Sequence, residues 1–171
     1  MTRTIGYVCS TSKGWIGVAA SARGIAGTTR PFGNEADARE ELAARFNDLP
    51  FGEARQDPLV ERLQAKLEDY FCGKRVIFDE PVDLGSAPAF RQRALEAARR
   101  IPYGEMRSYA WVAREIGNPG AARAVGQAMH YNPAPFIIPC HRVIASDGRL
   151  CGFGWGLDFK EWLLKLEGAS V

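Results

Sequence analysis

The first thirty residues alternate small, apolar and polar side chains in three short runs. These runs are TIGYVCS, WIGVAAS and GIAGTTR, and the turn-forming pieces TSKG and ARG separate them. Alternation with a period of two residues, broken by such pieces, is typical of antiparallel strands. The pattern therefore predicts a small antiparallel sheet.

Two amphipathic segments follow, at residues 34–46 and 57–73. The first begins with Asn34 and an acidic turn, and the second begins with Asp57 followed by Pro58. Asn and Asp are preferred at a helix N-cap, and Pro fits the first helical position. We therefore expect a helix in each segment.

The next segment, KRVIFDEPVDLG at residues 74–85, predicts a further strand and a connector. It ends in GSAP, a turn-forming stretch that favours a domain boundary near residue 86. We expect an N-terminal α/β domain with a structural role over residues 1–86, and a second domain over residues 87–171.

From Pro88 onwards the pattern is mainly helical. Ser108 is placed to cap one short helix and Asn118–Pro119 to cap the next, with a tight turn at Gly117 between them. Apolar residues three and four positions apart give each helix one stripe: Tyr109, Val112, Ala113 and Ile116, and then Ala122, Val125, Gly126 and Met129. Two short helices joined in this way form a helix-turn-helix pattern. A last helix is expected over residues 159–168.

Charge changes this picture in the middle of the chain. The net charge is only +2, but residues 88–130 hold seven arginines against three glutamates, a local net charge of +4. Such a patch can bind a polyanion such as a nucleic-acid backbone, and a solvated helix surface is the alternative. We find no run of eighteen apolar residues and no secretory-signal pattern, so we expect a cytoplasmic protein without membrane contact.

The second helix of the helix-turn-helix pattern is slim. Ala121, Ala122 and Gly126 lie where readers of the major groove usually carry long polar side chains. Small residues let a helix backbone approach the minor groove, and tight packing between helices is the alternative. Arg123 lies about 200° around the helix from Val125, so it is expected to project away from the core and toward DNA.

The stretch PFIIPCHRVIA sets Cys140 directly beside His141. The thiolate is the nucleophilic form of cysteine, and an unperturbed pKa of about 8.5 leaves little of it at neutral pH, so the thiol needs a base. Neighbours on an extended chain point to opposite sides, so we expect a bridging water or a bend. Glu167 is a candidate to orient the imidazole if the last helix folds back across the site. The alternative for Cys140 is a small core residue.

The remaining cysteines and histidines predict no metal site. The four cysteines are scattered without a Cys-x-x-Cys pair, and His130 and His141 lack metal-motif spacing. We expect reduced cysteines, no metal and no cofactor. Cys151 is expected to be a buried small residue, and an oxidation partner for Cys140 is the alternative.

Three motifs occur in order between Phe90 and Gly168: PYGEMRSY, AARAVGQAMHYNPAPFIIPCHRV and KEWLLKLEG. In this order they resemble the O6-alkylguanine-DNA alkyltransferases, which repair DNA by direct reversal. Residues 1–87 resemble that family in length and layout only. The resemblance implies an α+β fold: an N-terminal small antiparallel sheet with helices, then a mainly helical domain with a winged helix-turn-helix-like DNA-binding motif.

The resemblance also implies a methyltransferase that is consumed by its reaction. Cys140 would take the alkyl group from O6 of guanine, after a relay through water to His141 and Glu167 has removed the thiol proton. Asn132 matches the residue that braces the turn between the recognition helix and the active-site loop. An S-alkylcysteine is a thioether without a good leaving group, so one molecule would repair one lesion.

The implied partner is double-stranded DNA containing O6-alkylguanine, bound through the minor groove by a monomer, and cooperative assembly on DNA stays open. The damaged nucleotide would be flipped into a pocket. Arg123 matches the finger that fills the vacated place, and Tyr109 matches a residue that rotates the nucleotide and lines the pocket. The other implied contacts are Met129, Val143, Gly154 and Trp155 for the substrate, and Ala121, Ala122 and Gln127 for DNA.

Two departures from the family pattern affect these expectations. Several members have glycine where this chain has Trp155, so we expect a tighter pocket and faster repair of methyl than of benzyl lesions. Some relatives bind zinc through histidines and cysteines of the N-terminal half, whereas residues 1–87 contain no histidine. We therefore expect no zinc.

Two other functions compete with this interpretation. The first is a DNA-binding module that senses lesions without chemistry, and the second is a cysteine hydrolase. Relatives that only bind lesions lack the cysteine at the position of Cys140, and we identify no convincing oxyanion-hole motif. The sequence therefore favours alkyl transfer.

Overall fold

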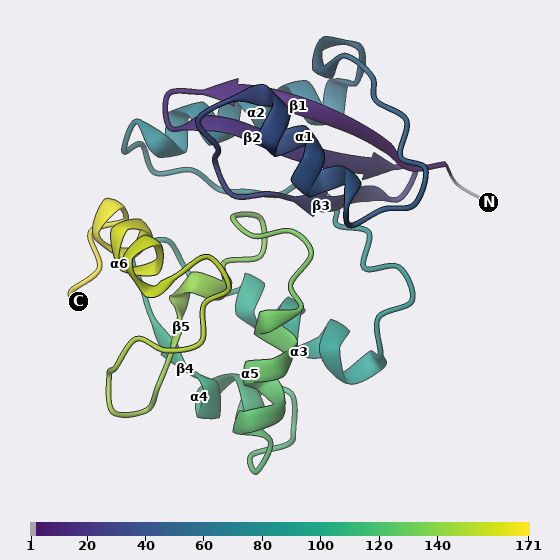
Figure 1. Cartoon of the computed structure of the whole chain (residues 1–171). Coiled ribbons are helices and arrows are strands. Elements are labelled where there is room, and N and C mark those ends of the chain that lie inside the picture. The colour runs from purple at the N-terminus through teal and green to yellow at the C-terminus, as the bar shows by residue number, and fades with distance from the viewer. Residues whose placement is uncertain (1–2) are drawn as a thin grey trace. The chain divides into compact units, whose positions relative to one another are not determined.

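A computed structural model describes residues 3–171, which form two compact units (Figure 1). Unit 1 is the chain up to Gly85 together with Pro133–Ile137, and unit 2 is Ser86–Asn132 together with Ile138–Val171. The α+β fold class expected from the sequence is confirmed. The roles assigned to the two predicted domains stay predictions.

Unit 1 is built on a three-stranded antiparallel sheet in the order β1-β2-β3. The strands are β1 (Ile5–Thr11), β2 (Gly14–Ser21) and β3 (Gly24–Thr28), so the predicted sheet is confirmed. Cys9 lies opposite Ile16 in the register, and both side chains are fully buried. Such cross-strand apolar pairs stabilise a sheet because partners share one face.

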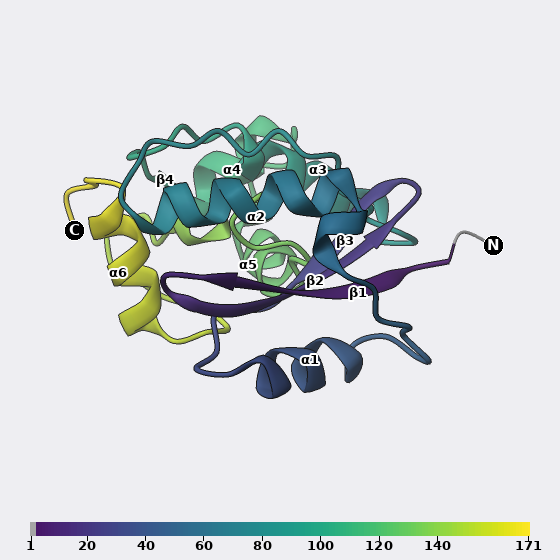
Figure 2. The ribbon, with the colours of Figure 1, turned by 90° about the horizontal axis from the view of Figure 1, so that it is seen from above.

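Two helices cover opposite faces of this sheet (Figure 2). They are α1 (Glu35–Ala43) and α2 (Pro58–Phe71), and a short 3-10 helix, η1 (Ala54–Gln56), precedes α2. Their N-caps are Asn34 and Asp57, as the sequence predicts. Both predicted helices are confirmed, although the first ends earlier than residue 46. The largest fully buried side chains of unit 1 are Ile16, Ile25, Leu42, Leu63, Leu67, Tyr70, Phe136 and Ile137.

The strand predicted within residues 74–85 is wrong. In the described chain this segment makes only an isolated bridge, between Val82 and Ile25. The N–H of Ile25 donates to the carbonyl of Pro81 at 2.8 Å, but Pro81 has no N–H with which to continue a ladder. The apolar residues that suggested a strand are not all buried, because the Ile77 side chain is 77% exposed.

Unit 2 is mainly helical, as expected. Its helices are α3 (Ala89–Arg99), α4 (Tyr109–Glu115), α5 (Ala122–His130) and α6 (Leu157–Leu166), and α4 and α5 form the predicted helix-turn-helix pair (Figure 1). Ser108 caps α4, since its side chain accepts from the N–H of Trp111 at 3.0 Å. No helix between residues 3 and 171 is long and apolar enough to cross a membrane.

The cap predicted for α5 is wrong. The helix begins at Ala122, and its N-cap, Ala121, makes no side-chain capping bond. Asn118 instead accepts from the N–H of Ala121 at 3.0 Å through its backbone carbonyl, which closes a turn before the helix starts. The Asn118–Pro119 pair therefore belongs to the connection between the helices.

The apolar stripe of α5 is also shifted from the one predicted. Its buried residues are Val125, Ala128 and Met129, whereas Ala122 and Gly126 are only partly covered. The period of 3.6 residues is right, but alanine and glycine carry too little apolar surface to show which face is buried. Two of the four expected core positions are therefore open to a cavity described below.

We expect Asp57→Ala to lower the free energy of unfolding by about 1–2 kcal/mol. The carboxylate accepts from the N–H groups of Leu59 and Val60 at 3.0 and 3.2 Å, and from the Tyr7 hydroxyl at 3.1 Å. Urea denaturation measures the change. The control is Asn34→Ala, which removes two exposed bonds to Asp37, one from its N–H and one to its carboxylate, and should cost about 0.5–1 kcal/mol. Equal losses in the two variants would contradict the prediction.

Candidate active site

A short parallel strand pair joins two of the sequence motifs. Strand β4 (Arg107–Ser108) pairs with strand β5 (Val143–Ile144). Tyr109 directly follows β4. The Cys-His pair is separated from β5 by one residue, Arg142. The pairing therefore brings PYGEMRSY beside PCHRVI, which are far apart along the chain.

The Cys-His pair lies on a tight turn. Residues Cys140–Arg142 form a 3-10 helix, η2, and the N–H of Cys140 donates to Ile138 at 2.8 Å. The same Ile138 carbonyl accepts from Nδ2 of Asn132 at 2.8 Å. Asn132 therefore braces this turn, and the bend expected between thiol and imidazole is present.

A buried carboxylate organises the groups around the turn. Glu167, which caps α6 at its C-terminal end, accepts from Nε2 of His141 at 2.7 Å. Arg142 binds both of its oxygens, from Nε at 2.8 Å and from Nη2 at 2.9 Å. The sequence-based expectation that the last helix brings Glu167 to the imidazole is met in the geometry.

The glycine of PYGEMRSY closes this network. The N–H of Gly104 donates to Oε2 of Glu167 at 3.2 Å. Its φ is +79°, and a Cβ placed there would come within 2.9 Å of the Glu167 carbonyl oxygen. Only glycine combines that left-handed backbone with so close an approach, so the motif has a local steric reason.

Burial and hydrogen bonding fix the charge of each member. Burial alone would raise the pKa of Glu167, but the bonds from His141 and Arg142 outweigh it and hold that pKa well below its usual range. Burial lowers the pKa of His141, and Glu167 opposes that shift only in part. The resting pair is therefore a carboxylate and a neutral imidazole. Because the carboxylate can only accept, Nε2 carries the proton, and Nδ1 keeps the lone pair that can act as a base.

The thiol itself is nearly enclosed. Cys140 is 6% exposed, and burial raises the pKa of its thiol. A hydrogen bond from the Asn132 side chain and the charge of Lys160 act in the opposite direction without cancelling the shift. The resting site therefore holds a thiol, and the thiolate has to be formed during a reaction.

Sequence reasoning missed Lys160 and Arg142. Lys160 is fully buried, and its Nζ donates to the carbonyls of Val143 at 2.6 Å and Cys151 at 3.0 Å. Burial lowers the pKa of Lys160. A signal was available, because Lys160 lies three and four positions before the apolar pair Leu163–Leu164 and so shares the buried face of α6.

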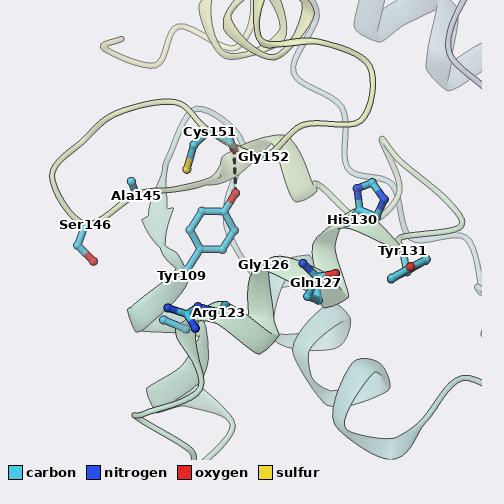
Figure 3. A pocket seen from close by; sticks show the side chains of 11 residues that line it. Tyr109, Arg123, Gly126, Gln127, His130, Tyr131, Ala145, Ser146, Cys151 and Gly152 are labelled. Atoms are coloured by element: carbon cyan, nitrogen blue, oxygen red, sulfur yellow. Dashed lines mark hydrogen bonds between the residues drawn. The ribbon is translucent and has the colours of Figure 1, made fainter.

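A cavity of about 640 Å³ is lined by Tyr109, by residues along the whole of α5 and by the loop after β5 (Figure 3). Tyr109 stands within it, and its hydroxyl donates to the Cys151 carbonyl at 3.0 Å. Its lining residues are Tyr109, Ala122, Arg123, Gly126, Gln127, His130, Tyr131, Ala145, Ser146, Cys151 and Gly152. Arg123 is exposed there, as expected, whereas His130 and Tyr131 were not foreseen.

Other residues assigned from the sequence lie outside this lining. Met129 and Val143 are buried in unit 2, and Gly154 is exposed. Trp155 packs against the rings of Phe153 and Phe159, with centroids 5.8 and 6.0 Å away. Their roles as substrate contacts stay predictions.

All four cysteines are free thiols. Cys9 and Cys140 are buried, Cys72 is exposed and Cys151 is half-buried. The expectation of a buried Cys151 is therefore wrong, because this residue lies in the cavity wall. Among residues 3–171 no group of three or more His, Cys, Asp or Glu side chains is placed to hold a metal ion.

Comparison with known proteins identifies the family. Residues 89–169 match the family model described as 6-O-methylguanine DNA methyltransferase, DNA binding domain. A methylated-DNA–protein-cysteine methyltransferase of Methanosarcina acetivorans is 42% identical over 122 residues, which cover 71% of this chain and 78% of that protein. This chain belongs to the methylated-DNA–protein-cysteine methyltransferase family. The family and the enzyme class expected from the PCHRVI motif are thus confirmed.

Other members of this methyltransferase family agree in sequence and in structure. A Mycolicibacterium paratuberculosis methyltransferase is 50% identical over 108 residues, covering 63% of this chain and 62% of that protein. The crystal structure of Mycobacterium tuberculosis OGT in complex with DNA superposes with a TM-score of 0.77 at 33% identity, covering 95% and 91% of the two chains. Because 95% of this chain is covered, the likeness to that solved structure extends over most of the residues before 89, which the family model does not match.

In this methyltransferase we expect Glu167→Gln to lower the free energy of unfolding by about 3–5 kcal/mol at pH 7. The change leaves the buried Arg142 charge without its partner. Because folding lowers the pKa of Glu167, its carboxylate stabilises the fold above the unfolded pKa of about 4.3, and that stability is lost as the pH falls through the folded pKa. The difference between variant and wild type should therefore narrow below about pH 5.

Urea denaturation at several pH values tests this expectation. Glu161→Gln on the same helix is the control, since its carboxylate is 43% exposed and pairs with Lys165. We expect it to change stability by less than about 1 kcal/mol. A deficit of Glu167→Gln that does not vary with pH would contradict the assignment of a buried carboxylate.

Proposed function

We propose that this protein flips O6-alkylguanine, chiefly O6-methylguanine, out of duplex DNA and moves the alkyl group irreversibly to its own Cys140. The observation that carries the proposal is the enclosed thiol of Cys140 beside the His141–Glu167 pair, in a chain of this family. DNA repair by alkyl transfer is the activity of the family, and DNA is its partner. The acceptor, the flipped base and the single turnover are the proposed parts.

The first step is removal of the thiol proton. Nδ1 of His141 accepts that proton through a bridging water, while Nε2 keeps its hydrogen bond to Glu167. The resulting imidazolium lies against the carboxylate, which favours the charged form. Asn132 and Lys160 stabilise the thiolate that is left on Cys140.

The second step is a displacement at the alkyl carbon. A sulfur lone pair of Cys140 forms the new S–C bond as the O6–C bond breaks, and the bonding electrons pass to the guanine. The proton that His141 took from the thiol is then returned through solvent to the guanine, which leaves as the neutral base while the imidazole becomes neutral again. Atoms and charge therefore balance without a cofactor. The product on the protein is an S-alkylcysteine, a thioether that water does not cleave readily. Each molecule therefore acts once.

The cavity supplies a path for the base from the DNA to the thiol. Tyr109 lines it and is held to the loop after β5 by its bond to the Cys151 carbonyl. Cys140 is not among the residues that line the cavity, so we propose that this loop or the Tyr109 side chain moves when the base enters. Removing a base from the stack costs a few kcal/mol, which contacts to the flipped nucleotide offset.

The start of α5 is the surface proposed to meet the DNA. Ala121 and Ala122 are partly exposed and carry almost no side chain, so the backbone of the duplex can come close in the minor groove. Arg123 is exposed at the mouth of the cavity, where it can occupy the place that the flipped base leaves. Gln127 is exposed one turn later on the same helix. We propose that a monomer binds in this way.

Intact mass after incubation with a duplex carrying one O6-methylguanine tests the transfer. We expect wild-type protein to gain about 14 Da, one methylene, with an equal loss of lesion from the DNA. Cys140→Ala, the control, should bind the duplex and gain nothing. Wild-type protein that binds the lesion without a mass change would instead indicate a lesion sensor.

Trp155→Gly tests the expected preference for small alkyl groups. Trp155 belongs to the loop that begins with Cys151 and Gly152 in the cavity wall, and its indole packs on two neighbouring rings. Removing the indole should raise the rate for O6-benzylguanine relative to O6-methylguanine, by about tenfold. The control is Trp162→Phe within α6, whose ring also stacks on Phe159. Equal wild-type rates for the two lesions would refute the preference.

A further inference from the structure

The chain that links α5 to the proposed acceptor passes through unit 1. Pro133–Ile137 belongs to unit 1, whereas Asn132 before it and Ile138 after it belong to unit 2. Cys140 follows only two residues after Ile138, and Asn132 bonds to the Ile138 carbonyl. Whatever holds Pro133–Ile137 therefore acts through the covalent chain on both residues.

Thr28 holds this segment by two hydrogen bonds. It is the last residue of β3 and is 1% exposed. Its N–H donates to the Pro133 carbonyl at 2.9 Å, and its Oγ1 donates to the Pro135 carbonyl at 3.0 Å. Arg45 adds a second bond to Pro133, from Nη2 at 3.0 Å. A buried hydroxyl bond of this kind is costly to break, because the carbonyl it leaves cannot reach water.

The segment keeps an unusual backbone at its centre. Phe136 has a φ of +76° although it is not glycine, and it is 2% exposed. Its ring packs edge-on against Tyr70 and Phe71, with centroids 6.2 and 5.5 Å away. A bulky residue stays in the left-handed region only where its surroundings determine the conformation. Unit 1 therefore sets the shape of this segment.

We propose that Thr28 is a positioning residue for alkyl transfer. It fixes Pro133–Ile137 and, through the chain, the places of Asn132 and Cys140 relative to each other. The inference rests on the proposed role of Cys140 as the acceptor. It gives unit 1 a part in the reaction rate, beyond the structural role expected from the sequence.

Thr28→Val and Thr29→Val test the proposal as a matched pair. Both threonines are 1% exposed, and both changes remove one hydroxyl while keeping the shape of the side chain. The Thr29 hydroxyl accepts from the N–H of Gly17 at 2.9 Å and donates to the Arg30 carbonyl at 2.8 Å, so its bonds go to other parts of unit 1. Any loss of stability from a buried hydroxyl is therefore common to the two variants.

The measurements are the single-turnover transfer rate on O6-methylguanine duplex, the DNA concentration at half-saturation, and the melting temperature. We expect Thr28→Val to transfer about 10- to 100-fold more slowly at saturating DNA, since a misplacement of about 1 Å can cost about 100-fold. Half-saturation should stay within about twofold of wild type, because the α5 surface is unchanged. Thr29→Val should transfer at the wild-type rate.

A wild-type rate for Thr28→Val, or equal slowing in both variants, would overturn the proposal. If Thr28→Val does not fold, Arg45→Met takes its place: slower transfer at saturating DNA supports the proposal, and an unchanged rate rejects it. Failure of the proposed function looks different, since wild-type protein would then gain no mass. If wild-type protein transfers the methyl group normally and Thr28→Val transfers it slowly, then Cys140 is the acceptor and Thr28 is a positioning residue.

Discussion

The buried charge of Glu167 is the constraint on which unit 2 depends. A carboxylate removed from water has to be neutralised and fully hydrogen-bonded, or burial costs several kcal/mol. The Glu167 carboxylate is neutralised by Arg142, which binds it in a bidentate manner. It also accepts hydrogen bonds from His141 and from the N–H of Gly104. His141 and Arg142 come from the PCHRVI motif and Gly104 comes from PYGEMRSY, while Glu167 itself lies in KEWLLKLEG, so the cluster joins three motifs of the sequence. One charge thus fixes the last helix, the PYG turn and the Cys-His turn together.

The same neutralisation shapes the chemistry. Arg142 already balances the charge of Glu167, so the resting cluster has no need of a protonated His141. Glu167 and Arg142 together carry no net charge. Moving a proton from Cys140 to His141 therefore creates one new ion pair, thiolate and imidazolium, beside the charge of Lys160. That buried ammonium lies where it favours the thiolate, and its own bonds go to two backbone carbonyls. A site of this kind keeps the thiol protonated and unreactive until an alkylated nucleobase is bound and the thiol proton moves to His141.

Local signals in the sequence were sufficient for most elements. The three strands, the caps Asn34, Asp57 and Ser108, and the helix-turn-helix pair follow from periodicity and capping chemistry. Non-local features were not readable in this way. The segment at residues 74–85 has strand-like letters, but its bridge to Ile25 is not extended back through Pro81, which has no N–H. The place of Lys160 on the apolar face of α6 could be read from the sequence, but the backbone carbonyls that accept from its ammonium group could not. The link from Glu167 to His141 was expected from a fold-back of the last helix and from the family resemblance, and periodicity did not predict it.

The corrected stripe of α5 bears on why this helix is slim. If Ala122 and Gly126 were core residues, their size would be explained by helix packing alone. They line the cavity instead, while Val125, Ala128 and Met129 provide the packing. An added side chain at Gly126 would extend toward Tyr109, whose ring lies 3.9 Å from a Cβ placed on Gly126. Small residues on this face therefore keep the space beside Tyr109 open, and this favours the interpretation in which the helix and the cavity serve one ligand.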